Sequence, residues 1–179
     1  MAEIRIHGRG GQGSVTAAEL IAVATFYGGK ASQAFPNFGV ERRGAPVTAY
    51  ARIEDKYIRL RSQITEPDFI IVQDASLVGG VDVFAGAKKG TVVLINTEKE
   101  AKDFVAPKGV EVKTIKATEL GMEIIGKPII NTILLGAFAA MSGLITIEAM
   151  ERAIKERFAG EIGEKNVEAA KRGFELIKK

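Results

Sequence analysis

Two short apolar runs constrain the fold of this chain more than any other feature. They span residues 69–73 and 91–95, carry no charge and are rich in Val and Ile. Runs of this kind, without alternating polar residues, are typical of parallel strands that are buried on both faces. Because parallel strands need long crossover connections that are usually helical, the two runs predict an α/β fold.

The rest of the pattern predicts alternating strands and helices in one domain. Further strands are expected at 3–7, 30–34 and 110–116, and helices at 14–27, 117–125, 129–142, 147–158 and 164–178. Segments 45–53 and 57–62 predict an inserted β-hairpin, whose Arg52, Arg59 and Arg61 would line a solvated or partner-facing strand face. We therefore expect residues 1–179 to form a single α/β domain, modified Rossmann-like, with a mostly parallel open sheet and helices on both faces.

The composition excludes several kinds of chemistry. The chain has no Cys, so it forms no disulfide, thiolate metal site or iron–sulfur cluster of its own. His7 is the single His, which excludes a His-based zinc site and a serine–histidine–aspartate triad. With 25 basic against 22 acidic residues, the charge balance does not indicate nucleic-acid binding. We predict neither a catalytic residue nor a metal site in this chain.

One long segment requires a test for membrane insertion. Residues 128–147 carry no charge, and their 20 residues would be long enough to cross a bilayer. The segment contains several polar residues and glycines, however, and Gly143 is expected to interrupt it. We therefore predict a buried or partner-covered helix, and no membrane association. The N-terminal residues do not resemble a signal peptide, so the expected compartment is the cytoplasm.

Two of the predicted helices lack a polar face. Helix 14–27 has Glu19 as its only charged residue, and helix 129–142 has none. A helix at the surface of a globular protein normally has one polar face. Because a domain of this size has little room for two central helices, we expect an extensive and permanent subunit interface.

A glycine-rich turn separates the first predicted strand from the first helix. Its sequence is Gly8-Arg9-Gly10-Gly11-Gln12-Gly13, which fits the G-x-G-x-x-G spacing, and Ser14 is a candidate N-cap. Such a turn, followed by a helix N-terminus, favours a phosphate group, and Arg9 would add a further anion contact. The acidic residue that binds the ribose of a dinucleotide is absent from residues 30–34. The turn therefore either binds another phosphate-bearing ligand or serves only to pack backbone against backbone.

Two further regions contain candidate binding residues. Segment 35–46 is rich in aromatic, charged and Pro residues; its Arg42 and Arg43 suit phosphate or carboxylate, and Glu41 suits an ion pair with Arg. The same charges would also suit a subunit interface. Asn131 lies at the start of an apolar helix and needs a hydrogen-bond partner, either a neighbouring loop or a ligand.

Three residues at predicted strand ends have structural explanations. Asp74 and Asn96 follow central strands, whose ends line the ligand crevice of open α/β sheets, but capping of the next turn explains each of them better. His7 is expected to be a structural hydrogen-bonding residue rather than a catalyst.

Taken together, these segments are similar to a known family. The glycine turn at 8–13, the segments 33–36 and 41–47, Glu66-Pro67-Asp68, Asn131-Thr132 with Leu135-Gly136, and residues 160–166 resemble the gamma subunit of 2-oxoacid:ferredoxin oxidoreductases. The resemblance spans essentially the whole chain. It is strongest to the pyruvate or 2-oxoisovalerate type of archaea and anaerobic thermophiles.

The resemblance implies a role in an enzyme complex. Enzymes of this family oxidatively decarboxylate a 2-oxoacid, transfer the acyl group to coenzyme A (CoA) and pass electrons to ferredoxin. Thiamine diphosphate, Mg and 4Fe-4S clusters are expected on partner alpha, beta and delta subunits, and no cofactor is expected on this chain alone. CoA contacts are possible here. The candidate cofactor-binding residues are Gly8, Arg9, Gly10, Gly11, Gln12, Gly13, Glu41, Arg42, Arg43 and Asn131.

Two other functions are compatible with the fold. One alternative is a stand-alone nucleotide- or flavin-binding regulatory module. The other is a free-standing NAD enzyme, which the missing ribose-binding acid disfavours. A stand-alone monomer should not expose two nearly charge-free helices, which disfavours the regulatory module.

Overall fold

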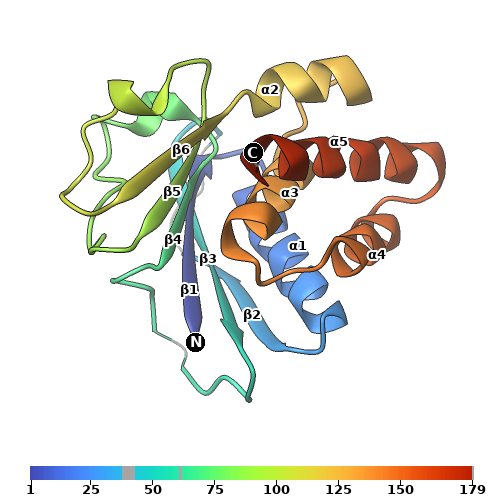
Figure 1. The fold of residues 1–179 in the computed structure, drawn as a ribbon, viewed down its shortest axis with the longest axis horizontal. Helices are drawn as coiled ribbons and strands as arrows, with labels where there is room; N and C mark the ends of the chain where they lie inside the picture. The colour runs from blue at the N-terminus through green and yellow to red at the C-terminus, as the bar shows by residue number, and fades with distance from the viewer. Residues whose placement is uncertain (38–42, 61, 179) are drawn as a thin grey trace.

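A six-stranded sheet organises the molecule (Figure 1). The computed structural model describes residues 1–37, 43–60 and 62–178. In the order β2-β3-β1-β4-β5-β6, strands β1, β4, β5 and β6 run parallel, and β3 is antiparallel to both of its neighbours. The predicted α/β class and mostly parallel open sheet are therefore confirmed. The strand bounds are Ala2–Arg9 (β1), Ala31–Pro36 (β2), Pro46–Glu54 (β3), Phe69–Val72 (β4), Val92–Asn96 (β5) and Glu111–Ile115 (β6).

The predicted hairpin at 45–62 is wrong in its pairing. The described residues of segment 57–62 form no strand, and β3 pairs instead with β1 and β2. Residues 49–53 of β3 are buried, so the backbone N–H and C=O groups along both of its edges need hydrogen-bond partners, which β1 and β2 provide. Arg52 is 1% exposed rather than solvated, because its Nε donates to Glu3 at 2.8 Å and its Nη2 to the Ser62 carbonyl at 2.7 Å. Arg59 is exposed, as predicted, and Arg61 lies outside the described residues.

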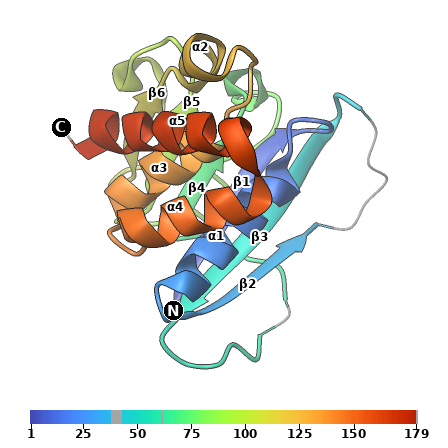
Figure 2. The same ribbon diagram turned by 90° about the vertical axis from the view of Figure 1, so that its right-hand side faces the viewer.

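The four long helices lie on one face of the sheet, not on both as predicted (Figures 1 and 2). They pack against alternate residues of the strands, including Ile4, Ile71 and Leu94. The opposite face is covered by short 3₁₀ turns and loops, which contribute Leu77 and Val83. The connections after β4 and β5 contain no α-helix, so the described part of the chain places none on that face. The helix bounds are Ser14–Tyr27 (α1), Ala117–Leu120 (α2), Asn131–Ser142 (α3), Ile147–Arg157 (α4) and Gly160–Lys178 (α5); a π-helical segment, Gly121–Ile125, continues α2.

Helix α3 is charge-free because the chain itself surrounds it. Residues 132–139 are all buried, and α5 lies along α3 in very close contact. A Cβ placed on Gly136 would overlap the Ala170 carbonyl oxygen, and one placed on Gly173 would lie 2.4 Å from the Ile133 carbonyl oxygen. The absence of charge on α3 therefore does not require a partner subunit, which corrects that part of the interface prediction.

Helix α1 differs from α3 in keeping an exposed side. Phe26 is 68% exposed, and Glu19 is exposed as well. A groove between α1 and α4 is lined by the apolar residues Leu20, Val23 and Ala153 and by Thr16, Glu19, Glu156 and Arg157. The interface prediction thus remains a prediction for α1. No helix among the described residues is long and apolar enough to cross a membrane, and the 128–147 segment is broken at Gly143, whose φ is 65°.

Candidate functional site

The carboxyl ends of the parallel strands form a cleft at one edge of the sheet. The glycine turn begins within the last residues of β1, Gln73 and Asp74 follow β4, Asn96 ends β5, and Lys116 follows β6. The chain leaves β1 toward β2 on one side and enters β4 on the other, so the strand order reverses between β1 and β4. Open α/β sheets bind ligands at such a reversal. Here the cleft has a volume of about 640 Å³ and is lined by Gln12, Gln73, Asp74, Asn96, Lys116 and Thr118, among others.

The glycine turn is tightly built into the fold. Gly11 and Gly13 have φ values of 95° and 75°, which L side chains rarely adopt. Gly8 lies within β1, and a Cβ there would overlap both the Ser14 hydroxyl and the Gln73 side-chain oxygen. Gly13, not the predicted Ser14, is the N-cap of α1, and no side chain caps this helix. Among the described residues, the first-turn amides of α1 thus have neither an intrahelical nor a side-chain partner.

Arg9 is already paired within the chain. Its Nε lies 3.1 Å from Asp74 Oδ2, Nη1 donates to the Gly44 carbonyl at 3.0 Å, and Nη2 donates to Ser76 Oγ at 2.8 Å. Gln12 also donates to Asp74 Oδ2, at 3.1 Å. Arg9 therefore ties the glycine turn to the end of β4 and to the start of β3, and its charge is largely neutralised there.

Asp74 is held in its charged form. Burial raises its pKa, but hydrogen bonds from the Ser76 hydroxyl and backbone and from Gln12, together with the charge of Arg9, outweigh burial and lower the pKa overall. The Ser76 amide donates to Asp74 Oδ1 at 2.9 Å, which confirms the predicted capping role. Asn96 is likewise structural: its Nδ2 donates to the Gln73 carbonyl and to Thr118 Oγ1, both at 2.9 Å.

Asn131 reaches the glycine turn through a chain of polar side chains. Ser14 Oγ donates to Gln73 Oε1 at 2.6 Å, and Gln73 Nε2 donates to Asn131 Oδ1 at 2.9 Å. A Cβ placed on Gly13 would lie 2.6 Å from Asn131 Nδ2, so the starts of α1 and α3 meet at this point. Gln73 was not among the predicted site residues. The signal available in the sequence was a polar residue at the end of an apolar strand.

The remaining predicted residues have different positions. Arg43 is exposed and forms an isolated β-bridge with Gly10, which places it beside the turn. Glu41 and Arg42 lie outside the described residues. His7 is buried and accepts a hydrogen bond from Arg5 Nε at 3.1 Å; burial and the Arg5 charge lower the pKa of His7 to about 4, so it is neutral and structural.

Known proteins match this chain over its whole length. The family model described as pyruvate ferredoxin/flavodoxin oxidoreductase matches residues 3–176. Pyruvate synthase subunit PorC of Methanocaldococcus jannaschii is 53% identical over 180 residues, covering 100% of this chain and 99% of the relative. The pyruvate/ketoisovalerate oxidoreductases common subunit gamma of Thermococcus litoralis is 53% identical, covering 98% of this chain and 96% of the relative.

Solved structures show the same fold. The pyruvate oxidoreductase subunit PORC of Thermotoga maritima superposes with a TM-score of 0.86 at 32% identity, covering 97% of this chain and 95% of that one. A 2-oxoglutarate:ferredoxin oxidoreductase from Magnetococcus marinus matches with a TM-score of 0.82 at 21% identity, covering 99% of this chain but 31% of the longer one. The family model and the full-length relatives together show that the chain belongs to the pyruvate ferredoxin/flavodoxin oxidoreductase family and is built like its gamma subunits.

Proposed function

We propose that this chain is the gamma subunit of a pyruvate, or related 2-oxoacid, ferredoxin oxidoreductase and that it contributes to CoA binding at the cleft of the sheet. The relatives named as PorC or gamma subunits, about half identical over the full length, support the subunit role. The Magnetococcus marinus structure contains 2-oxoglutarate, coenzyme A and succinyl-CoA. That likeness supports the fold, and the case for CoA here rests on the geometry of the cleft.

The meeting of two helix starts beside Gly13 is the observation that carries the proposal. The first-turn amides of α1 lack a side-chain cap, and Asn131 Nδ2 lies next to them. Helix N-termini favour anions, and CoA carries a diphosphate and a 3′-phosphate. Arg43 lies beside the same turn, whereas Arg9 is already paired with Asp74. We therefore propose that Arg43 contacts a phosphate and that Arg9 holds the turn in place.

The redox chemistry is assigned to partner subunits. A chain without Cys provides no thiolate for an iron–sulfur cluster, and the described residues contain no group of three or more His, Asp or Glu arranged to hold a metal. We propose that alpha, beta and delta subunits bind thiamine diphosphate, Mg and the 4Fe-4S clusters. Ferredoxin is then the electron acceptor of the cytoplasmic complex.

The stand-alone regulatory module remains the alternative. Because α5 buries α3 within the chain, the charge-free α3 does not require a partner subunit, and one argument against the stand-alone module is removed. Native mass spectrometry of the complex, purified through a tag on this chain, separates the two functions. Co-purification with thiamine- and cluster-binding chains supports the subunit role. A monomer or homo-oligomer without them contradicts it.

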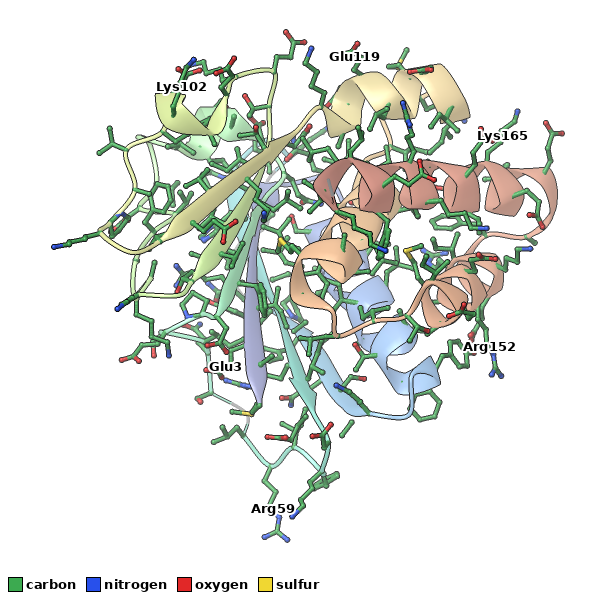
Figure 3. The ribbon with its side chains drawn as sticks, viewed as in Figure 1. Glu3, Arg59, Lys102, Glu119, Arg152 and Lys165 are labelled. Carbon is green, nitrogen blue, oxygen red and sulfur yellow. The ribbon has the colours of Figure 1, made fainter. Side chains whose placement is uncertain are left out.

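The CoA role is tested by Arg43→Ala in the purified complex. Losing a charged phosphate contact should raise the KM for CoA by about tenfold, which corresponds to about 1.4 kcal/mol, while the KM for pyruvate stays unchanged. Arg59→Ala is the matched control. Arg59 is also exposed, but it projects from the end of the molecule opposite the carboxyl ends of the parallel strands (Figure 3). An unchanged KM for CoA in an assembled Arg43→Ala complex would refute the assignment of Arg43.

A further inference from the structure

We infer that Gln73 is a positioning residue for CoA binding: it fixes the side-chain amide of Asn131 so that the Nδ2 donors, and not the Oδ1 acceptor, face the start of α1. The inference rests on the proposed function, since it concerns how Gln73, which lines the cleft, orients hydrogen-bond donors beside Gly13 for a phosphate. Gln73 itself does not touch the ligand in this arrangement.

Gln73 is held in place by its backbone as well as by its side chain. It is 1% exposed, its amide donates to the His7 carbonyl at 2.8 Å, and its carbonyl accepts from Asn96 Nδ2 at 2.9 Å. It is thereby fixed between the ends of β1 and β5. The side-chain oxygen accepts from Ser14 at 2.6 Å, and the side-chain nitrogen donates to Asn131 at 2.9 Å. Both ends of the Gln73 amide are therefore used.

The polarity of this hydrogen-bonded chain decides what the ligand meets. A serine hydroxyl can donate or accept, so the chain Ser14–Gln73–Asn131 has two possible directions. In the observed direction Asn131 Oδ1 is used by Gln73, and among the described residues Nδ2 has no hydrogen-bond partner. In the reverse direction Asn131 would turn Oδ1 toward Gly13. An anionic ligand is attracted by the first arrangement and repelled by the second.

The surroundings of Asn131 Nδ2 favour an anion. The nitrogen lies beside the N-cap of α1, whose helix end carries partial positive charge. The Asn131 donors therefore lie close to the start of α1, and we propose that a phosphate bound there accepts hydrogen bonds from both. The observed direction of the chain is therefore the one suited to an occupied site.

The glycine spacing fits the same arrangement. A Cβ on Gly8 would overlap both the Ser14 hydroxyl and the Gln73 oxygen, and a Cβ on Gly13 would displace the Asn131 amide. The first and last glycines of the turn thus make room for the polar chain. This explains how a G-x-G-x-x-G turn is used here without a ribose-binding acid.

The test measures the KM for CoA, the KM for pyruvate and kcat in purified complexes. Gln73→Met removes the hydrogen bonds while keeping the side-chain length, and it should raise the KM for CoA about fivefold. Gln73→Glu should raise it further, because a carboxylate accepts from both neighbours and turns Asn131 Oδ1 outward. The KM for pyruvate and kcat at saturating CoA should change by less than about twofold. Gln63→Glu, at an exposed position away from the cleft, is the control and should leave all three values unchanged.

A double-variant cycle separates positioning from direct contact. In an Asn131→Ala background, Gln73→Met should have less than about twofold additional effect, because the residue it orients is gone. An undiminished fivefold effect in that background would overturn the inference. If Gln73→Met does not assemble, Asn131→Asp provides the test: it presents an oxygen in either orientation and should raise the KM for CoA at least tenfold. An unchanged KM in Asn131→Asp would also overturn the inference.

The two proposals fail in different ways. If Arg43→Ala and Asn131→Asp both leave the KM for CoA unchanged, CoA does not bind at this cleft and the proposed function is wrong. If both raise it while Gln73→Met does not, CoA binds at the cleft but Gln73 does not position Asn131.

Discussion

The close contact between α3 and α5 predicts that Gly136→Ala destabilises the fold. In an isolated helix this change would stabilise the chain by about 1 kcal/mol, because Ala has the higher helix propensity. Here the new methyl group would overlap the Ala170 carbonyl oxygen, which belongs to the backbone and cannot rotate away. Helix α5 must therefore shift as a body and loosen its packing. Overpacking and lost contacts together should outweigh propensity and lower the free energy of unfolding by about 2–4 kcal/mol.

Urea unfolding of the chain, followed by far-ultraviolet circular dichroism, measures this loss. Thermal unfolding followed by the same signal should give a midpoint about 5–15 °C below that of the unmodified chain, for a domain of this size. Glu168→Ala, on the exposed face of α5, is the control and should change the free energy of unfolding by less than about 0.5 kcal/mol. An unchanged or higher midpoint for Gly136→Ala would show that backbone contact does not set the distance between these helices.

Two further predictions concern the sheet face opposite the helices. His7 should stay neutral down to about pH 4, because burial and the charge of Arg5 lower its pKa; NMR titration of the single imidazole checks this. Between about pH 6.5 and pH 4 the unfolded chain binds a proton on His7 that the folded chain does not. The free energy of unfolding should therefore fall by about 3 kcal/mol as the pH is lowered across this range. This loss should be absent in His7→Gln, and a folded-state pKa near 6.5 would contradict the argument. Arg52→Met should lower the free energy of unfolding by about 2–3 kcal/mol, because Glu3 and the Ser62 carbonyl lose their partner. Equal urea midpoints for Arg52→Met and Arg59→Met would refute this.

Local signals in the sequence were enough to locate most elements. Helix α1 has the predicted bounds, because the apolar run 14–27 is enclosed by glycines on both sides. The strands β4 and β5 were recognisable from their continuous apolar residues. In these segments the hydrophobic pattern and the chain-breaking residues agree, and tertiary contacts do not override them.

The pairing of β3 depends on contacts distant in sequence. Its alternation of Ala and Ile with Tyr and Arg is typical of a half-exposed hairpin strand. Arg52 can be buried because Glu3, 49 residues away, the Ser62 carbonyl and Gln33 accept hydrogen bonds from its guanidinium group. Nothing near Arg52 in the sequence indicates these partners.

The sequence predicts which segments form the candidate site but not the ion pairs and hydrogen bonds that connect them. The glycine turn and Asn131 do meet, at Gly13, and Gln12 of the turn lines the cleft. Arg9 was expected to remain available for a ligand, but Asp74, 65 residues away, pairs with it. Gln73 was overlooked because its role depends on Ser14 and Asn131, which are 59 and 58 residues away.

The close packing of α5 on α3 has a consequence for folding during synthesis. Helix α5 follows α3 in the chain and covers it, and residues 132–139 of α3 are all buried. Until α5 has left the ribosome, a nascent chain exposes the apolar side of α3. The helical layer is therefore completed only after residues 160–178 have been synthesised, and a chain truncated before Gly160 exposes a surface suited to chaperones and to aggregation.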